Sequence, residues 1–226
     1  MRSRPSGFAR CLREVLVKVT GDPSLGADPR VPTDAAPYVV RFRYFDPIAQ
    51  RRPHDDQGSY DRSYDLTVTF DRARIGGLVA SLGRKIWTGT RPVVLPVIRM
   101  RGSSKPWVID FPVTADDPAA EPQRMALRNA GTKYGVRVRL PERALVDELE
   151  RSMDRPEPDT MTRAEAMLVV GELHWTPEDL GWTGSWRGRW SGREYRAGVR
   201  GVSFDEAFER LVRGVVQVAA GTGPFG

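Results

Sequence analysis

A two-residue turn, Ser191-Gly192, separates two segments in which small or aromatic residues alternate with arginine. Such a turn joins antiparallel strands and fixes which residues lie opposite each other, because side chains alternate between the faces of a sheet. One face is predicted to pair Trp190 with Arg193, Gly188 with Tyr195, Trp186 with Ala197 and Gly184 with Val199, and the other face Arg189 with Glu194 and Arg187 with Arg196. On this register Tyr195 should cover the bare glycine opposite it.

The second face of this hairpin is a candidate binding surface. Arg187, Arg189 and Arg196 share it, so it is expected to be exposed to water and positively charged. Arginines interleaved with aromatic residues are typical of proteins that hold single-stranded nucleic acid. The alternation argues against that use, because the tryptophans fall on the opposite face and stacking needs both residue types on one surface. Binding of a phosphate backbone by charge alone remains an alternative hypothesis.

Hydrophobic periodicity places the other elements. Helices are expected at 8–19, 71–82, 121–130, 143–153 and 203–221, and strands at 38–45, 64–70, 93–100, 107–111, 136–140 and 166–175. Asp71 and Ser203 are expected to be the N-caps of the second and the last helix. The pattern predicts an α+β (mixed α/β) fold: a mixed sheet with βαβ crossover units, a C-terminal antiparallel Trp-rich hairpin, and helices packed on the sheet.

Two further predictions concern strands in the first half of the chain. In 38–45 the apolar residues Tyr38, Val40, Phe42 and Tyr44 alternate with arginines, so this apolar face is expected to point inward. Strand 64–70, helix 71–82 and strand 93–100 follow one another as in a right-handed crossover. Pro96 in the last of these strands lacks a backbone donor, which predicts a bulge or an edge position.

Length and composition predict one globular domain. The chain has 226 residues, 40% hydrophobic and 28% charged, a balance typical of a packed core. One domain is expected over residues 8–220, with flexible termini at 1–7 and 221–226. The 35 Lys and Arg residues outnumber the 29 Asp and Glu residues, and the net charge of +6 favours anionic partners without choosing among them. No segment approaches the roughly 20 apolar residues that a membrane span needs.

No residue pattern identifies a catalytic site, a metal site or a cofactor site. The single cysteine, Cys11, excludes an intramolecular disulfide and a cysteine-based zinc site, and it is expected to be a buried thiol. Gly76-Gly77 follows no nucleotide-binding pattern. Glu172 and His174 share one strand face, and a surface pair is favoured over a proton shuttle.

The segment 46–63 is a long polar loop that contains His54, Asp55 and Asp56. These residue types serve in acid–base chemistry and in cation binding. Their spacing matches no calcium loop, zinc pair or nucleophile elbow, so a polar turn-forming loop is favoured over a site.

Several motifs, taken in order, resemble a proteobacterial family called domain of unknown function 2066. They are the segment from Gly7 to Pro23, Phe42-Arg43-Tyr44, His54-Asp55-Asp56-Gln57-Gly58, the segment from Asp65 to Asp71, Ile86-Trp87 before Arg91-Pro92, and the Trp-rich hairpin. The resemblance covers the chain from about Gly7 to about Ala220. It implies an envelope-associated protein, since relatives commonly begin with an export signal, and it implies no activity, cofactor or catalytic residue.

Together these observations favour a non-enzymatic binding or scaffolding module of the bacterial cell envelope. Its expected contacts are Arg187, Arg189, Arg196 and the 46–63 loop, including His54, Asp55 and Asp56, and its expected partner is an envelope protein or an anionic ligand. The alternatives are a hydrolase or transferase that uses the 54–61 loop, and a phosphate-backbone binder. The segment that starts at Met1 lacks the apolar core of a signal peptide, which predicts the cytoplasm; the resemblance predicts the periplasm if an export signal is missing from this sequence.

Overall fold

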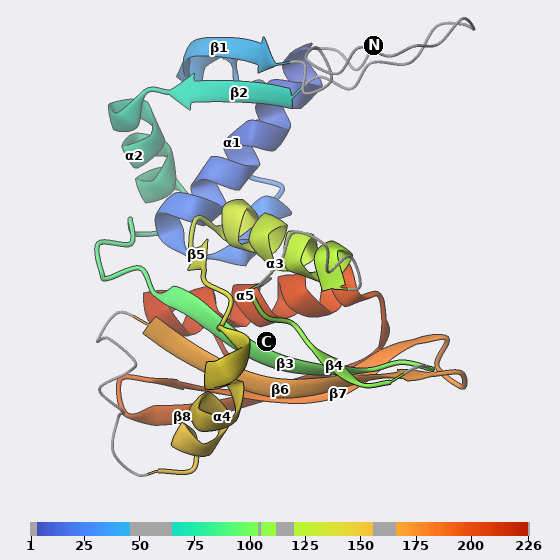
Figure 1. Cartoon of the computed structure of the whole chain (residues 1–226). Helices are drawn as coiled ribbons and strands as arrows, with labels where there is room; N and C mark the ends of the chain where they lie inside the picture. Colours follow the sequence, from blue (N-terminus) through green and yellow to red (C-terminus); the bar gives the residue numbers. More distant parts are fainter. Residues whose placement is uncertain (1–3, 46–64, 104, 112–119, 156–165, 226) are drawn as a thin grey trace, which may run out of the picture. The chain divides into compact units, whose positions relative to one another are not determined.

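The described part of the chain has an α+β fold with five α-helices, a two-stranded antiparallel sheet and a mixed six-stranded sheet, as predicted (Figure 1). The computed structural model describes residues 4–45, 65–103, 105–111, 120–155 and 166–225. Contacts between Cα atoms group the chain into two compact units, Met1–Thr20 with Ser24–Ile86, and Gly21–Pro23 with Trp87–Gly226. A single domain over residues 8–220 stays a prediction.

The first unit contains α1 (Arg4–Thr20), β1 (Val39–Phe45), β2 (Asp65–Phe70) and α2 (Arg72–Ser81), with short 3-10 turns at Pro23–Gly26 and Ala36–Tyr38. Leu12 and Leu16, one helical turn apart on α1, are fully buried. Asp71 caps α2 as predicted, because its carboxylate accepts a hydrogen bond from the Arg74 backbone N–H at 2.9 Å. Helix α1 begins at Arg4, within the segment expected to be flexible.

The apolar face of β1 is more exposed than predicted. The register with β2 shifts between Val39 and Arg41, so Val40 is the extra residue of a β-bulge, and it is 62% exposed. Phe42 contacts Phe8 of α1 edge to face, with ring centroids 5.1 Å apart, yet it remains 41% exposed. The predicted inward face is therefore wrong, because a bulge changes which residues share a face and a two-stranded sheet covers little surface.

The second unit contains the six-stranded sheet and three helices. Its elements are β3 (Val93–Arg101), β4 (Trp107–Val108), α3 (Glu121–Tyr134), β5 (Arg137–Val138), α4 (Val146–Ser152), β6 (Ala166–Thr176), β7 (Gly181–Trp190), β8 (Arg193–Val202) and α5 (Phe204–Ala220). The strand order is β4-β3-β6-β7-β8, and β5 also pairs with β3. The predicted crossover through α2 is wrong, since β2 and β3 belong to different sheets; the parallel pairs are β3 with β5 and β3 with β6. Strand periodicity shows that a segment is extended, but it does not show which sheet the segment joins.

Strand β3 is almost continuously apolar because helices cover both faces of the sheet there. Its partners on the outer side are short: β5 pairs at Val93 and Val94, and β4 pairs at Arg99 and Met100. Pro96 falls between these two pairings. Its missing N–H therefore interrupts no hydrogen bond between strands. The predicted bulge or edge position for Pro96 is wrong, because β3 lies between β4 and β6 and its register with β6 is unbroken; the gap between β4 and β5 accommodates the proline instead.

The hairpin of β7 and β8 has the predicted register, from Trp190 opposite Arg193 to Gly184 opposite Val199. Ser191 and Gly192 have φ angles of 49° and 76°, as a type I′ turn requires. The space above Gly188 is filled differently from the prediction. A Cβ atom there would lie 2.8 Å from Met167 and 3.0 Å from Phe225. These two side chains therefore cover the glycine that Tyr195 was predicted to cover.

The sheet of the second unit has helices α3 and α5 on one face and α4 on the other (Figure 1). Helix α5 begins at the predicted Ser203 cap, whose hydroxyl accepts from the Glu206 backbone N–H at 3.1 Å, and it ends at Gly221 with a φ angle of 69°. Flexibility of residues 221–226 stays a prediction; among them Phe225 is buried and packs on Tyr195.

Candidate binding groove

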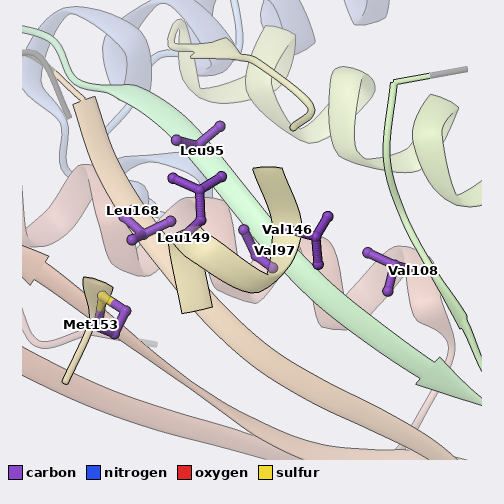
Figure 2. Close-up of a cluster of buried hydrophobic side chains, with 7 residues drawn as sticks. All are labelled: Leu95, Val97, Val108, Val146, Leu149, Met153 and Leu168. Carbon is purple, nitrogen blue, oxygen red and sulfur yellow. The ribbon is translucent and has the colours of Figure 1, made fainter. Parts of the chain in front are cut away.

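Helix α4 is too short to be stable alone, and apolar packing holds it on the sheet. Figure 2 shows the buried side chains that dock it: Val146, Leu149 and Met153 from α4, Leu95 and Val97 from β3, Leu168 from β6 and Val108 from β4. These side chains occupy one half of the sheet face that α4 covers. The other half of the face carries polar and charged residues.

Two arginines of the sheet fasten α4 through hydrogen bonds. Arg99 donates to both carboxylate oxygens of Glu150 at 2.7 Å and to Asp147 at 2.9 Å. The hydrogen bond to Glu150 is the main cause that raises the pKa of Arg99 above its ordinary value. Arg189 donates to the backbone carbonyls of Met153 at 2.5 Å and of Arg155 at 2.7 Å, at the C-terminal end of α4 where carbonyls lack helical partners.

A groove of about 420 Å³ runs beside α4 over the charged half of this face. It is lined by Arg99 from β3, Glu150 from α4, Val170, Gly171 and Glu172 from β6, Ser185, Trp186 and Arg187 from β7, and Arg196 and Ala197 from β8. The lining therefore comes from four neighbouring strands and one helix, and it offers guanidinium and carboxylate groups together. Ion pairs and hydrogen bonds are the contacts that such a surface makes with a ligand.

Arg187 and Arg196 lie directly opposite each other on β7 and β8, and both line this groove. Like charges in this position destabilise a strand pair. Each arginine forms an ion pair: Arg187 with Asp154 at 2.7 Å, and Arg196 with Glu194 at 2.8 Å. The Asp154 side chain is 67% exposed and that of Arg196 is 77% exposed, so water competes with both ion pairs.

The face was expected to be positive, and the structure places acidic partners beside Arg99, Arg187 and Arg196 but binds Arg189 to backbone carbonyls. Arg101 likewise binds Glu172 at 2.7 Å. The face therefore carries carboxylates beside several of its arginines. His174 is exposed and shares the face with Glu172, as predicted.

The structure separates the predicted contact residues. Arg187 and Arg196 meet in the groove, whereas Arg189 is engaged with the end of α4, so a ligand-binding role for Arg189 stays a prediction. His54, Asp55 and Asp56, with the rest of the 46–63 loop, lie outside the described residues, and the roles predicted for them are not tested.

The contact residues predicted from the sequence do not include Arg99 and Glu150, which complete the groove. Arg99 and Arg101 alternate with apolar residues in β3, a signal that places both on one face. Glu150 gives no comparable signal, because only the docking of α4 brings it to the sheet.

The described residues contain no group of three or more His, Cys, Asp or Glu side chains placed to hold a metal ion. None of the helices in the described ranges is long and apolar enough to cross a membrane.

Comparison with known families finds one match, which is confined to the first part of the chain. Residues 1–88 match a domain of unknown function, DUF8605. It differs from the domain of unknown function 2066 that the motifs resemble. The DUF8605 segment ends within two residues of Ile86, where the first compact unit ends, so the groove lies outside it. Searches of curated proteins and of solved structures return no match to the chain.

Proposed function

We propose that this protein is a non-enzymatic binding module and that its groove takes an anionic group between Arg187 and Arg196. The observation that carries the proposal is the placement of these two arginines directly opposite each other within the groove. A phosphate or carboxylate between them would turn a repulsive pair into two charge-assisted hydrogen bonds.

The existing ion pairs of these arginines are weak competitors for a ligand. Exposed salt bridges contribute about 0–1 kcal/mol, and both pairs include a side chain that is mostly exposed to water. A ligand anion can therefore replace Asp154 and Glu194 at low cost. The neighbouring carboxylates Glu150 and Glu172 stay bound to Arg99 and Arg101, and they would favour a ligand that also carries a positive group.

Inorganic phosphate is the simplest probe of this site. We expect millimolar phosphate to raise the melting temperature of the full chain relative to chloride at equal ionic strength, because a ligand of the folded state stabilises it by mass action. Arg187→Gln and Arg196→Gln should each lose most of this increase.

Arg193→Gln is the matched control. It removes the same charge from the same strand, β8, but Arg193 pairs with Trp190 on the opposite face of the sheet. The control should keep the full response to phosphate. An equal response in Arg196→Gln and Arg193→Gln would contradict the groove as the site.

The cell envelope is the proposed place of action, and the resemblance to domain of unknown function 2066 supports it. The test is fractionation of cells that express the full-length gene with a C-terminal tag. Recovery in the periplasm is expected, and recovery in the cytoplasm alone would contradict the proposal while leaving the groove hypothesis intact.

A further inference from the structure

The two edges of the six-stranded sheet differ in how they are protected. On one side β3 is followed by two-residue strands, β4 and β5, with Pro96 in the gap between them. On the other side β8 is ten residues long, contains no proline or lysine, and keeps a regular ladder with β7 from Arg193 to Val199. Short strands and prolines prevent pairing between sheets, and a long regular edge permits it.

Among the described strands, none pairs with the outer edge of β8, which presents backbone groups at alternate residues. The turn at Ser191-Gly192 places Trp190 and Arg193 in a hydrogen-bonded pair, as residues i and i+3 of a β-turn. Hydrogen-bonded and non-hydrogen-bonded pairs alternate along an antiparallel ladder. The N–H and C=O groups of Glu194, Arg196 and Gly198 therefore point away from β7, and these residues are exposed.

We propose that β8 pairs antiparallel with β8 of a second copy of this chain, with Ala197 opposite Ala197 on the two-fold axis. A two-fold axis uses the same surface on both copies, so the edge must be complementary to itself. In this register Glu194 lies opposite Arg200 of the second copy, and Arg196 lies over the bare Gly198.

The alternative registers are less favourable. A shift that centres the axis on Arg196 places two arginines directly opposite each other, which costs stability. A shift that centres it on Tyr195 pairs Glu194 with Arg196 but shortens the ladder to the residues around the turn. The register on Ala197 joins opposite charges and pairs the edge from Glu194 to Arg200.

The first test measures the mass of the full chain by sedimentation between about 1 and 100 μM, a range that covers micromolar dissociation constants. A dimer of the 25.3 kDa chain is expected. Arg196→Pro should be monomeric, because it removes an outward N–H that β7 does not use. Arg196→Gln keeps the N–H and should remain dimeric while losing its response to phosphate, which separates this proposal from the proposed function.

The second test reports the register and does not depend on how the proline variant folds. In a Cys11→Ser background, Cys11 being the only cysteine, single cysteines are placed at Tyr195, Arg196 and Ala197. Opposite residues of a non-hydrogen-bonded pair have Cα atoms about 4.5 Å apart, within the range of a disulfide. Ala197→Cys should cross-link fastest under mild oxidation with oxidised glutathione. A monomer at all concentrations, or faster cross-linking at Tyr195 or Arg196, would overturn the proposal.

Discussion

Asp179 holds together the turn that joins β6 to β7. Its carboxylate accepts hydrogen bonds from Arg200 Nε at 3.0 Å and from the hydroxyls of Thr176 and Thr183 at 3.2 Å each. These bonds stabilise the charged form, and the one from Arg200 is the main cause that lowers the pKa of Asp179. The same turn keeps Leu180 at a φ angle of 48°, a left-handed conformation that costs an ordinary residue about 1–2 kcal/mol. The carboxylate therefore offsets local backbone strain.

The lowered pKa gives the stability of this turn a defined pH dependence. A carboxyl whose pKa is lower in the folded state stabilises the fold above its unfolded value of about 3.9, and this contribution disappears as pH falls further. Urea unfolding of the wild type and of Asp179→Asn from pH 6 to pH 2.5 should show a difference in unfolding free energy that shrinks toward the acid end. A constant difference across this range would contradict the role assigned to the carboxylate.

Arg189 and Arg187, two residues apart on β7, are expected to differ in their contribution to stability. Arg189→Gln loses two charge-assisted hydrogen bonds to backbone carbonyls and should lower the unfolding free energy by about 1–2 kcal/mol. Arg187→Gln loses one exposed ion pair and should cost less than about 1 kcal/mol. Chemical denaturation of both variants measures the contrast, and equal losses would mean that Arg189 does not hold α4.

At the scale of elements, a strand's pairing can be predicted from the sequence where neighbouring residues determine it. The register of β7 and β8 follows from the sequence, because the Ser191-Gly192 turn fixes every pair that follows it. The face that β1 buries does not follow from the sequence, because nothing in the residues around Val40 predicts a bulge. The groove is harder still, since Arg99, Glu150 and Arg196 meet only after the strand order and the docking of α4 are known.

Packing, more than helix propensity, should decide the stability of α4. Leu149 is 4% exposed within the cluster of Figure 2, and Leu149→Ala should lower the unfolding free energy by about 2–4 kcal/mol. Leu180→Ala is the control, because Leu180 is 80% exposed and its truncation should change stability by less than about 0.5 kcal/mol. Urea denaturation distinguishes the two. A loss below about 1 kcal/mol for Leu149→Ala would mean that α4 detaches without unfolding the sheet.

At the scale of the whole molecule, two observations coincide. The DUF8605 match covers residues 1–88, and the first compact unit ends at Ile86. The groove and the outer edge of β8 both belong to the part of the second unit that follows the match. Both proposals therefore concern a part of the chain that should keep its structure when the first unit is removed.

A fragment of residues 87–226 tests this expectation. It lacks Gly21, whose carbonyl accepts a hydrogen bond from the Thr222 hydroxyl at 2.6 Å in the second unit. The fragment should unfold cooperatively, with a stability lower by about 1 kcal/mol than that of the same unit in the full chain. Thr222→Val in the full chain removes the same hydrogen bond and should cost a similar amount. Calorimetry of the full chain should then show two transitions, one of which matches the fragment. The opposite result is a fragment without a cooperative transition and a single transition for the full chain. It would establish one domain over residues 8–220, because each unit would then depend on the other for its core.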